Sequence, residues 1–139
     1  MLPLIIVTGP TTSKKSETAI ELAEKINSEI ISADSMQVYK YFDIGTAKVT
    51  PEDRSRVPHH LIDILEPDQE FSAFDFKTRA LDHTRELLNQ GKVPIITGGS
   101  GLYIKALCEG YDCAVQINPQ IKKQVQSDIL TKGLTKMHM

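Results

Sequence analysis

Four short hydrophobic runs lie along the chain, and longer segments rich in polar residues separate them. The first run, Leu4 to Thr8, is continuous and rich in β-branched residues, as expected for a strand buried on both faces of a parallel sheet. Three further brief runs lie at residues 30–31, 61–65 and 93–97. We predict a strand at each of the four positions.

Helical periodicity fills two of the segments between these runs. From Ser16 onward the apolar residues form one stripe, made of Ala19, Ile20, Leu22, Ala23 and Ile26. Ser72 followed by Asp75 is a capping-box pattern that predicts the start of a second helix, which Gly91 ends. The inner face of this second helix is predicted to comprise Ala73, Phe76, Ala80, Leu81, Thr84, Leu87 and Leu88.

Two shorter helices are expected where a capping side chain precedes a proline, at Thr50-Pro51 and at Asn118-Pro119. Strands separated by helices predict an α/β fold with a parallel sheet and right-handed crossovers. We assign residues 1–113 to this core and residues 114–139 to a helical tail. The thin apolar stripe of the tail has little to pack against within the chain.

Composition agrees with a single ordinary domain. The chain has 139 residues, of which 40% are hydrophobic, and no stretch approaches the roughly 20 apolar residues of a membrane helix. A cytoplasmic protein with no membrane contact is therefore expected, with Cys108 and Cys113 as free thiols. The formal net charge of -2 lacks the basic balance of most proteins that bind nucleic-acid backbones.

A phosphate-binding loop is predicted directly after the first strand, because residues 9–16 nearly match the P-loop pattern G-x-x-x-x-G-K-[ST]. Backbone N–H groups and the helix dipole would attract an anion there, Lys15 adds a positive charge, and the Ser16 hydroxyl can ligate Mg²⁺. A turn that merely caps the helix is the alternative. The predicted diphosphate- or nucleotide-binding residues are Gly9, Pro10, Thr11, Thr12, Ser13, Lys14, Lys15 and Ser16.

Two departures from a nucleotide-hydrolysing P-loop are visible. Lys14 replaces the second glycine, whose usual backbone conformation is unfavourable by roughly 1–3 kcal/mol for a residue with a Cβ atom, so strain or a relaxed loop is expected. The strand at 93–97 leads into Thr-Gly-Gly-Ser-Gly without the aspartate that normally holds the metal. ATP or GTP hydrolysis is therefore disfavoured, and a glycine-rich turn is left where backbone can approach a ligand closely.

Asp34 follows the second strand and should lie at the same edge of the sheet as the loop. A carboxylate beside an anion site is unfavourable unless a metal intervenes or the carboxylate transfers a proton, so a general base or a metal-organising residue is one interpretation. A capping aspartate for the turn at Ser35 is the other.

Two further groups are ambiguous. His59 and His60 are candidate ligands, but adjacent histidines point apart on most backbones, so surface or hydrogen-bonded core positions are favoured over metal binding. Lys48 follows Gly45-Thr46-Ala47 in a loop near the same edge, where it would steady a phosphate or, as is commoner, be solvated.

Six ordered blocks resemble the tRNA dimethylallyltransferase family, also called isopentenyl-tRNA transferases. The resemblance runs from about residue 4 to Gly110. Its blocks are Gly9-Pro10-Thr11 with Lys15-Ser16, then residues 31–39, 43–48, 58–63, 71–73 and 98–103.

The resemblance implies transfer of a dimethylallyl group from dimethylallyl diphosphate to N6 of the adenosine on the 3′ side of a tRNA anticodon. By position, residues 9–16 would hold the diphosphate and Mg²⁺, with Ser16 as the metal ligand, and Asp34 would be the general base. The residues implied to contact tRNA are Asp34, Ser35, Met36, Gln37, Ser100 and Lys122.

The chain also differs from the family's pattern. It ends where such enzymes continue with a helical part, which predicts a P-loop NTPase-like core truncated before that part. The residues from about Ala114 match only loosely. Two other functions therefore stay open: a small P-loop kinase of nucleotides or metabolites, and an inactive phosphate-binding remnant. The kinase would need an arginine-rich lid, which the sequence lacks.

Overall fold

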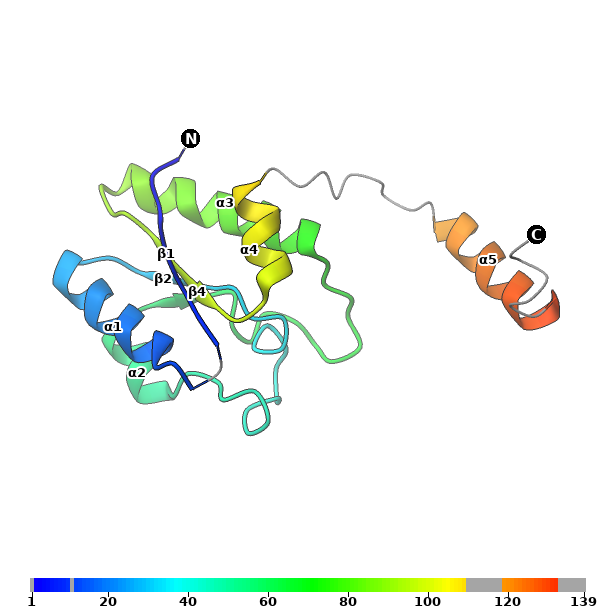
Figure 1. Ribbon diagram of the computed structural model, residues 1–139, viewed down its shortest axis with the longest axis horizontal. Helices are drawn as coiled ribbons and strands as arrows, with labels where there is room; N and C mark the ends of the chain where they lie inside the picture. The colour runs from blue at the N-terminus through cyan, green and yellow to red at the C-terminus, as the bar shows by residue number, and fades with distance from the viewer. Residues whose placement is uncertain (1, 11, 110–118, 133–139) are drawn as a thin grey trace.

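One parallel sheet organises the chain (Figure 1). The computed structural model describes residues 2–10, 12–109 and 119–132. The strands lie in the order β1-β4-β2-β3, and every pairing is parallel, which confirms the predicted α/β fold. In chain order the elements are β1 (Ile5–Thr8), α1 (Lys15–Ile26), β2 (Ile30–Ser32), α2 (Pro51–Arg56), β3 (His59–His60), α3 (Ala73–Asn89), β4 (Ile95–Gly98), α4 (Gly101–Cys108) and α5 (Pro119–Lys132).

The central strands bury apolar side chains on both faces, as their continuous runs predicted. Ile30 and Ile95 are register partners, as are Ile31 and Ile96, and all four are fully buried. The first pair belongs to a cluster formed with α1, which includes Ala19, Ile20, Ala23 and Val57. The second pair, Ile31 and Ile96, belongs to a cluster formed with α3 and α4. The other buried members of this cluster are Ala33, Leu61, Phe76, Ala80, Leu87 and Tyr103. Helices therefore cover both faces of the sheet.

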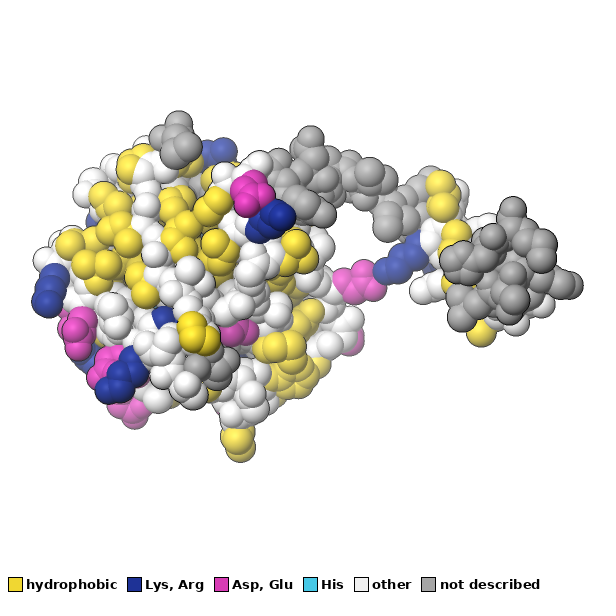
Figure 2. Space-filling view, in the orientation of Figure 1, with side chains coloured by type: hydrophobic (Ala, Val, Ile, Leu, Met, Phe, Trp, Pro, Cys, Tyr) yellow, Lys and Arg dark blue, Asp and Glu magenta, His cyan; other side chains and the backbone are white. Residues whose placement is uncertain are grey.

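The edge strand β1 is less well covered than β2 and β4. Its three apolar residues, Ile5, Ile6 and Val7, are only half-buried. Hydrophobic side chains accordingly gather around it on the face shown in Figure 2. The sheet is thus most deeply buried at β2 and β4. The end of β2 leads into the turn of Asp34, and the end of β4 leads into the glycine-rich turn.

The strand predicted at residues 61–65 is wrong in position, because the third strand is β3 at His59–His60. Beyond β3 the chain leaves the extended conformation, since Leu61 and Asp63 have positive φ angles of 61° and 55°. The apolar run marked burial rather than a strand. Its buried members are Leu61, Ile62 and Leu65.

The helix starts are decided locally, by capping side chains. The Ser72 hydroxyl accepts from the Asp75 N–H at 3.2 Å, and the Asp75 carboxylate accepts from the Ser72 N–H at 2.9 Å, which confirms the capping box. Thr50 caps α2 with Pro51 at its first position, also as predicted. α3 ends at Asn89, two residues before Gly91, whose φ is 75°.

α5 lies apart from the sheet (Figure 1). Three of its apolar side chains, Ile121, Val125 and Leu130, are 59%, 41% and 86% exposed. The predicted cap Asn118 and the boundary between residues 113 and 114 lie outside the described residues. None of the described helices combines the length and the apolar character needed to cross a membrane.

Ser72→Ala should lower the free energy of unfolding by about 1 kcal/mol, because it removes the N-cap acceptor and the partner of Asp75. Hydrogen bonds from Ser72 lower the pKa of Asp75 from its ordinary 3.8. The stabilisation should therefore be complete above that value and decrease as the pH falls below it.

Urea denaturation followed by circular dichroism at pH 7 and pH 3 measures both effects. Thr78→Ala is the control, because Thr78 lies inside α3 and, within the described part of the chain, its hydroxyl bonds only to the Phe74 carbonyl of the same helix. Alanine is the better helix former, so this variant should be unchanged or more stable. Equal losses in the two variants would contradict the role of the capping box.

Candidate functional site

A cleft of about 440 Å³ lies at the carboxyl ends of the strands. It is bounded by the loop after β1, the turn after β2 and the end of β4, which is where ligands bind in open α/β sheets. The structure therefore brings together the loop and the carboxylate that the sequence placed at one edge. The lining includes Thr12, Lys14, Lys15, Ser16, Asp34, Met36, Gln37, Gly98 and Gly99.

The loop after β1 contains two non-glycine residues with left-handed φ angles, Thr12 and Lys14. Lys14 is the N-cap residue of α1 and has left-handed angles, with φ 56° and ψ 20°. Thr12 has a φ of 72°. Lys15, the first residue of the helix, is half-buried, and its Nζ donates to the Pro10 carbonyl at 3.4 Å. Thr11 lies outside the described residues.

The strain expected at Lys14 is present, because this residue retains the left-handed conformation that suits glycine. Its side chain is 80% exposed and pairs with Glu17 at 3.6 Å, one helical turn away. The lysine is therefore accommodated outward, at the mouth of the cleft, while the backbone keeps its curvature. The loop has not relaxed to avoid the substitution.

Asp34 caps a turn and also lines the cleft. Its Oδ1 accepts from the N–H groups of Met36 at 2.9 Å and Gln37 at 3.2 Å. The capping interpretation is therefore right, and the position in the cleft leaves the interpretation as a base open. Among the described residues both hydrogen bonds fall on Oδ1, so Oδ2 is the oxygen available to accept a proton.

Ser100 and Gly98 join the glycine-rich turn to the turn of Asp34. The Ser100 hydroxyl accepts from the Ser35 N–H at 2.9 Å, and the Ser100 N–H donates to the Ala33 carbonyl at 3.1 Å. A Cβ atom at Gly98 would lie 2.1 Å from the Ala33 oxygen. The close approach that requires glycine here is thus to the neighbouring backbone of this chain rather than to a ligand.

Gln37 connects the turn to the loop that contains Gly45, Thr46 and Ala47, which the sequence placed near the same edge of the sheet. It is 8% exposed, and its side-chain amide donates to the carbonyls of Thr46 and Ala47, both at 3.2 Å. Gly45, Thr46, Ala47 and Val49 also line the cleft. The family-like block at residues 43–48 was the available signal, but nothing in its composition indicated that it folds over Gln37.

Lys48 is neither solvated nor free to contact a phosphate, so both expectations for it were wrong. Its side chain is 5% exposed. Nζ donates to the Tyr39 carbonyl at 2.8 Å, to Asp43 at 2.8 Å and to Asp63 at 2.6 Å. Three acceptors match the three N–H groups of an ammonium, which leaves none for a phosphate.

The two histidines are hydrogen-bonded and separate, as expected. His59 Nδ1 lies 2.7 Å from the Val57 carbonyl oxygen, and His60 Nε2 lies 2.7 Å from a Glu29 carboxylate oxygen. Burial lowers the pKa of His59, although the Val57 carbonyl opposes this shift, so the ring is neutral at pH 7. Within the described residues, no group of three or more His, Cys, Asp or Glu side chains is arranged to hold a metal ion.

A magnesium ion bound with a diphosphate does not need such a group. Mg²⁺ keeps several waters and takes one or two protein oxygens beside the phosphate oxygens. The exposed Ser16 hydroxyl and the Asp34 carboxylate both line the cleft and are hard oxygen donors of the required kind. The residues present therefore fit a diphosphate-bound Mg²⁺.

Lys122 lies on α5, away from the lining of the cleft. Its Nζ pairs with both carboxylate oxygens of Glu70, at 2.9 Å and 3.1 Å. The structure thus brings four of the predicted loop residues into one cleft with Asp34, Met36 and Gln37, and places Ser35 and Ser100 beside it. The four are Thr12, Lys14, Lys15 and Ser16, whereas Gly9, Pro10, Ser13 and Lys122 do not line this cleft.

By its sheet and the position of its loop, this is a P-loop-type α/β protein. The model of the IPP transferase family matches residues 37–139, and the chain belongs to this family. The tRNA dimethylallyltransferase of Staphylococcus aureus strain JH9 is 59% identical over 109 residues, which are 78% of this chain and 35% of the relative. The chain thus spans about a third of the length of the curated relatives it matches.

Solved structures give the same family. The tRNA delta(2)-isopentenylpyrophosphate transferase of Staphylococcus epidermidis is 52% identical, with a TM-score of 0.74 over 91% of this chain and 41% of that one. The tRNA isopentenylpyrophosphate transferase of Bacillus halodurans is 37% identical, with a TM-score of 0.79 over 99% and 46%. A eukaryotic dimethylallyltransferase acting on tRNA is 28% identical, with a TM-score of 0.72 over 88% and 34%.

Lys14→Gly should raise the free energy of unfolding by roughly 0.5–1 kcal/mol, because glycine adopts the left-handed conformation without a Cβ penalty. The gain is smaller than the penalty itself, since glycine also increases the entropy of the unfolded chain. Urea denaturation measures it. Lys14→Ala is the matched control, because it removes the same charge but keeps the Cβ atom, and it should give no gain. Equal stabilisation by both variants would show that charge, not backbone strain, is relieved.

Proposed function

We propose that the chain provides the donor-binding and base-bearing part of an enzyme that transfers a dimethylallyl group from dimethylallyl diphosphate to tRNA. The acceptor is N6 of the adenosine on the 3′ side of the anticodon. The observation that carries this proposal is that residues of the predicted phosphate-binding loop and Asp34 line the same cleft. Membership of the IPP transferase family supports it.

The loop is the proposed site of the diphosphate. The N-terminus of α1 presents backbone N–H groups and the positive end of the helix dipole, and Lys15 begins that helix. Thr12, Lys14 and Ser16 also line the cleft beside it. These groups favour the leaving diphosphate over the intact ester, because negative charge develops on the bridging oxygen as the bond breaks.

Asp34 is the proposed general base. N6 of the adenine forms a bond to C1 of the dimethylallyl group, the bond from C1 to the diphosphate oxygen breaks, and diphosphate leaves with that electron pair. The proton released from N6 passes to Asp34 Oδ2. An exocyclic amine is a weak nucleophile, so a carboxylate positioned to take its proton increases the rate.

Mg²⁺ is proposed to bind with the diphosphate, with Ser16 Oγ as the protein ligand. When bound, it would neutralise part of the charge of the leaving group. The chain itself contributes the hydroxyl, the lysine ammonium and the loop amides. These groups would hold the diphosphate in the cleft that Asp34 also lines.

The acceptor adenine must leave its stack to reach the cleft. Met36 is 47% exposed at the rim, next to Asp34, and the apolar lining of the cleft suits a base. Ser35, Gln37 and Ser100 are the other proposed contacts to tRNA in this region. Contact by Lys122 would require its ion pair with Glu70 to open. A tRNA substrate makes the cytoplasm the proposed location.

A small-molecule kinase is less well supported. The end of β4 and the turn after it have no carboxylate, and among the described residues no arginine lines the cleft. Phosphoryl transfer ordinarily uses both a metal-holding aspartate and a cation that neutralises the transferred phosphoryl group.

A transfer assay tests the proposed function directly. Radiolabelled dimethylallyl diphosphate is incubated with Mg²⁺, the chain and an anticodon stem-loop RNA that carries the adenosine or a uridine in its place. We expect label in the adenosine RNA alone. Pyrophosphate binding by calorimetry is measured in parallel. Binding of pyrophosphate without transfer would support the inactive remnant. The absence of both binding and transfer would overturn the proposal.

Asp34→Asn should reduce the transfer rate on the order of 10²–10⁴-fold, because an amide cannot take the proton from N6. Pyrophosphate affinity should stay within twofold, because the loop is unchanged. Asp68→Asn, at an exposed loop position, is the control and should behave as the unaltered chain. Full turnover by Asp34→Asn would remove the role of base.

A further inference from the structure

We propose that Lys48 is a positioning residue, whose buried ammonium holds the loop at residues 39–48 against the turn that carries Asp34. The inference rests on the proposed function only in giving Asp34 its chemical task. The placement of the turn is itself measurable without any transfer reaction.

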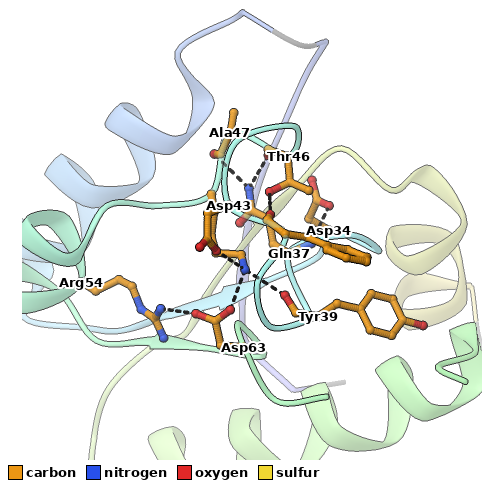
Figure 3. Close-up of polar contacts among 10 residues, drawn as sticks. Asp34, Gln37, Tyr39, Asp43, Thr46, Ala47, Arg54 and Asp63 are labelled. Carbon is orange, nitrogen blue, oxygen red and sulfur yellow. Dashed lines mark hydrogen bonds and ion pairs between the residues drawn. The ribbon is translucent and has the colours of Figure 1, made fainter. Parts of the chain in front are cut away.

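Lys48 joins two segments of the chain through three acceptors, one backbone carbonyl and two carboxylates. Figure 3 shows dashed lines converging from Tyr39, Asp43 and Asp63 on one ammonium group, which belongs to Lys48. Tyr39 and Asp43 lie at the start of the loop, and Asp63 lies in the segment that follows β3. Because the lysine itself ends the loop, its one side chain closes the loop on itself and fastens it to its neighbour.

The acceptor side of this contact is fixed independently. Arg54, on α2, donates to Asp63 Oδ2 at 2.6 Å, while Lys48 takes Oδ1. Burial alone would raise the pKa of Asp63, but the hydrogen bonds and charges of these two cations lower it, so the carboxylate is ionised at pH 7. Burial likewise opposes the charge of Lys48, and Asp43 and Asp63 more than compensate and raise its pKa. Charged hydrogen bonds of this kind are the strongest available to a side chain.

The backbone around Lys48 needs such restraint. Positive φ angles occur at Tyr41 (67°) and Ala47 (46°) in the loop, and at Leu61 (61°) and Asp63 (55°) in the neighbouring segment. None of the four is glycine, and each such residue is unfavourable by about 1–2 kcal/mol unless its surroundings hold it. Lys48 contacts one segment and belongs to the other, so it holds both.

Gln37 transmits this restraint to Asp34. Its side-chain amide donates to the carbonyls of Thr46 and Ala47, directly before Lys48, and its own carbonyl accepts from the Asp63 N–H at 3.1 Å. Its N–H is one of the two donors to Asp34 Oδ1. Figure 3 shows Gln37 beside Asp34, with dashed lines from its side chain to Ala47 and Thr46. Freeing the loop therefore removes the acceptors that hold Gln37 and loosens the carboxylate.

Hydrogen exchange of the amides of the ¹⁵N-labelled chain, followed by NMR, tests this arrangement. The N–H groups of Met36 and Gln37 report on the Asp34 turn, and the N–H of Ile96, in the centre of the sheet, reports on global unfolding. In Lys48→Met, which keeps the length of the side chain without its charge, exchange at Met36 and Gln37 should accelerate about tenfold or more beyond any change at Ile96.

Lys40→Met is the matched control. Lys40 lies on the same loop and also forms an ion pair, with Glu66 at 2.5 Å, but its side chain is 41% exposed and touches neither the cleft nor Gln37. It should leave the ratio of exchange rates within twofold. Equal acceleration at all three amides in Lys48→Met, or none, would overturn the proposal, because Lys48 would then act on stability alone or not at all.

Asp43→Asn is the second variant, because the Asp43 side chain is 67% exposed and the substitution removes the negative charge of one of the three acceptors while the core is untouched. It should give a smaller acceleration, confined to the same two amides, even if Lys48→Met does not fold. Uniform exchange in Asp43→Asn would contradict the proposal. If the unaltered chain transfers label, Lys48→Met should lower kcat at least tenfold and leave the KM for the donor within twofold of its value in the unaltered chain. If the unaltered chain does not transfer label, that result bears on the proposed function and not on the role of Lys48.

Discussion

The close contact between the ends of β2 and β4 is the constraint on which the site depends. Gly98 lies against the Ala33 backbone so closely that a single added carbon would be 2.1 Å from the carbonyl oxygen. The Ala33 N–H also donates to the Thr97 carbonyl at 2.7 Å. Asp34 follows this contact directly, and its turn is tied to Ser100 just beyond it. The cleft has its shape because two parallel strands end together, without side chains between them.

The cations near that contact fall into two groups. Lys14 and Lys15 line the cleft, whereas the cations Lys48 and Arg54 are taken up by the carboxylate of Asp63. The chain can therefore offer a positive loop to a diphosphate despite a formal net charge of -2. The overall balance of charge, which disfavoured a nucleic-acid partner, says little about a pocket that needs only a few cations on one side.

Local signals predicted much of the fold. The capping box at Ser72 and the proline after Thr50 each placed a helix start correctly, because a cap depends on residues within one turn. The run at 61–65 misled, since buried apolar residues on an irregular backbone have the composition of a strand. The strand His59–His60 was missed because its two side chains are polar. Their hydrogen-bond partners are the nearby Val57 carbonyl and the distant Glu29 carboxylate.

The sequence by itself determined the type of fold, the loop and its misfit lysine, and the carboxylate at the end of the second strand, because these follow from contiguous residues. The cap that holds Asp34 is local as well, and only the tertiary structure decided what holds Gln37 behind it. The partners of Gln37 and Lys48 are carbonyls and carboxylates 5 to 15 residues away in the chain. The most distant of them, Asp63, follows β3, which pairs with β2. The local sequence around a loop lysine does not show whether its side chain is solvated or buried. The acceptors that the fold brings to the ammonium decide between the two.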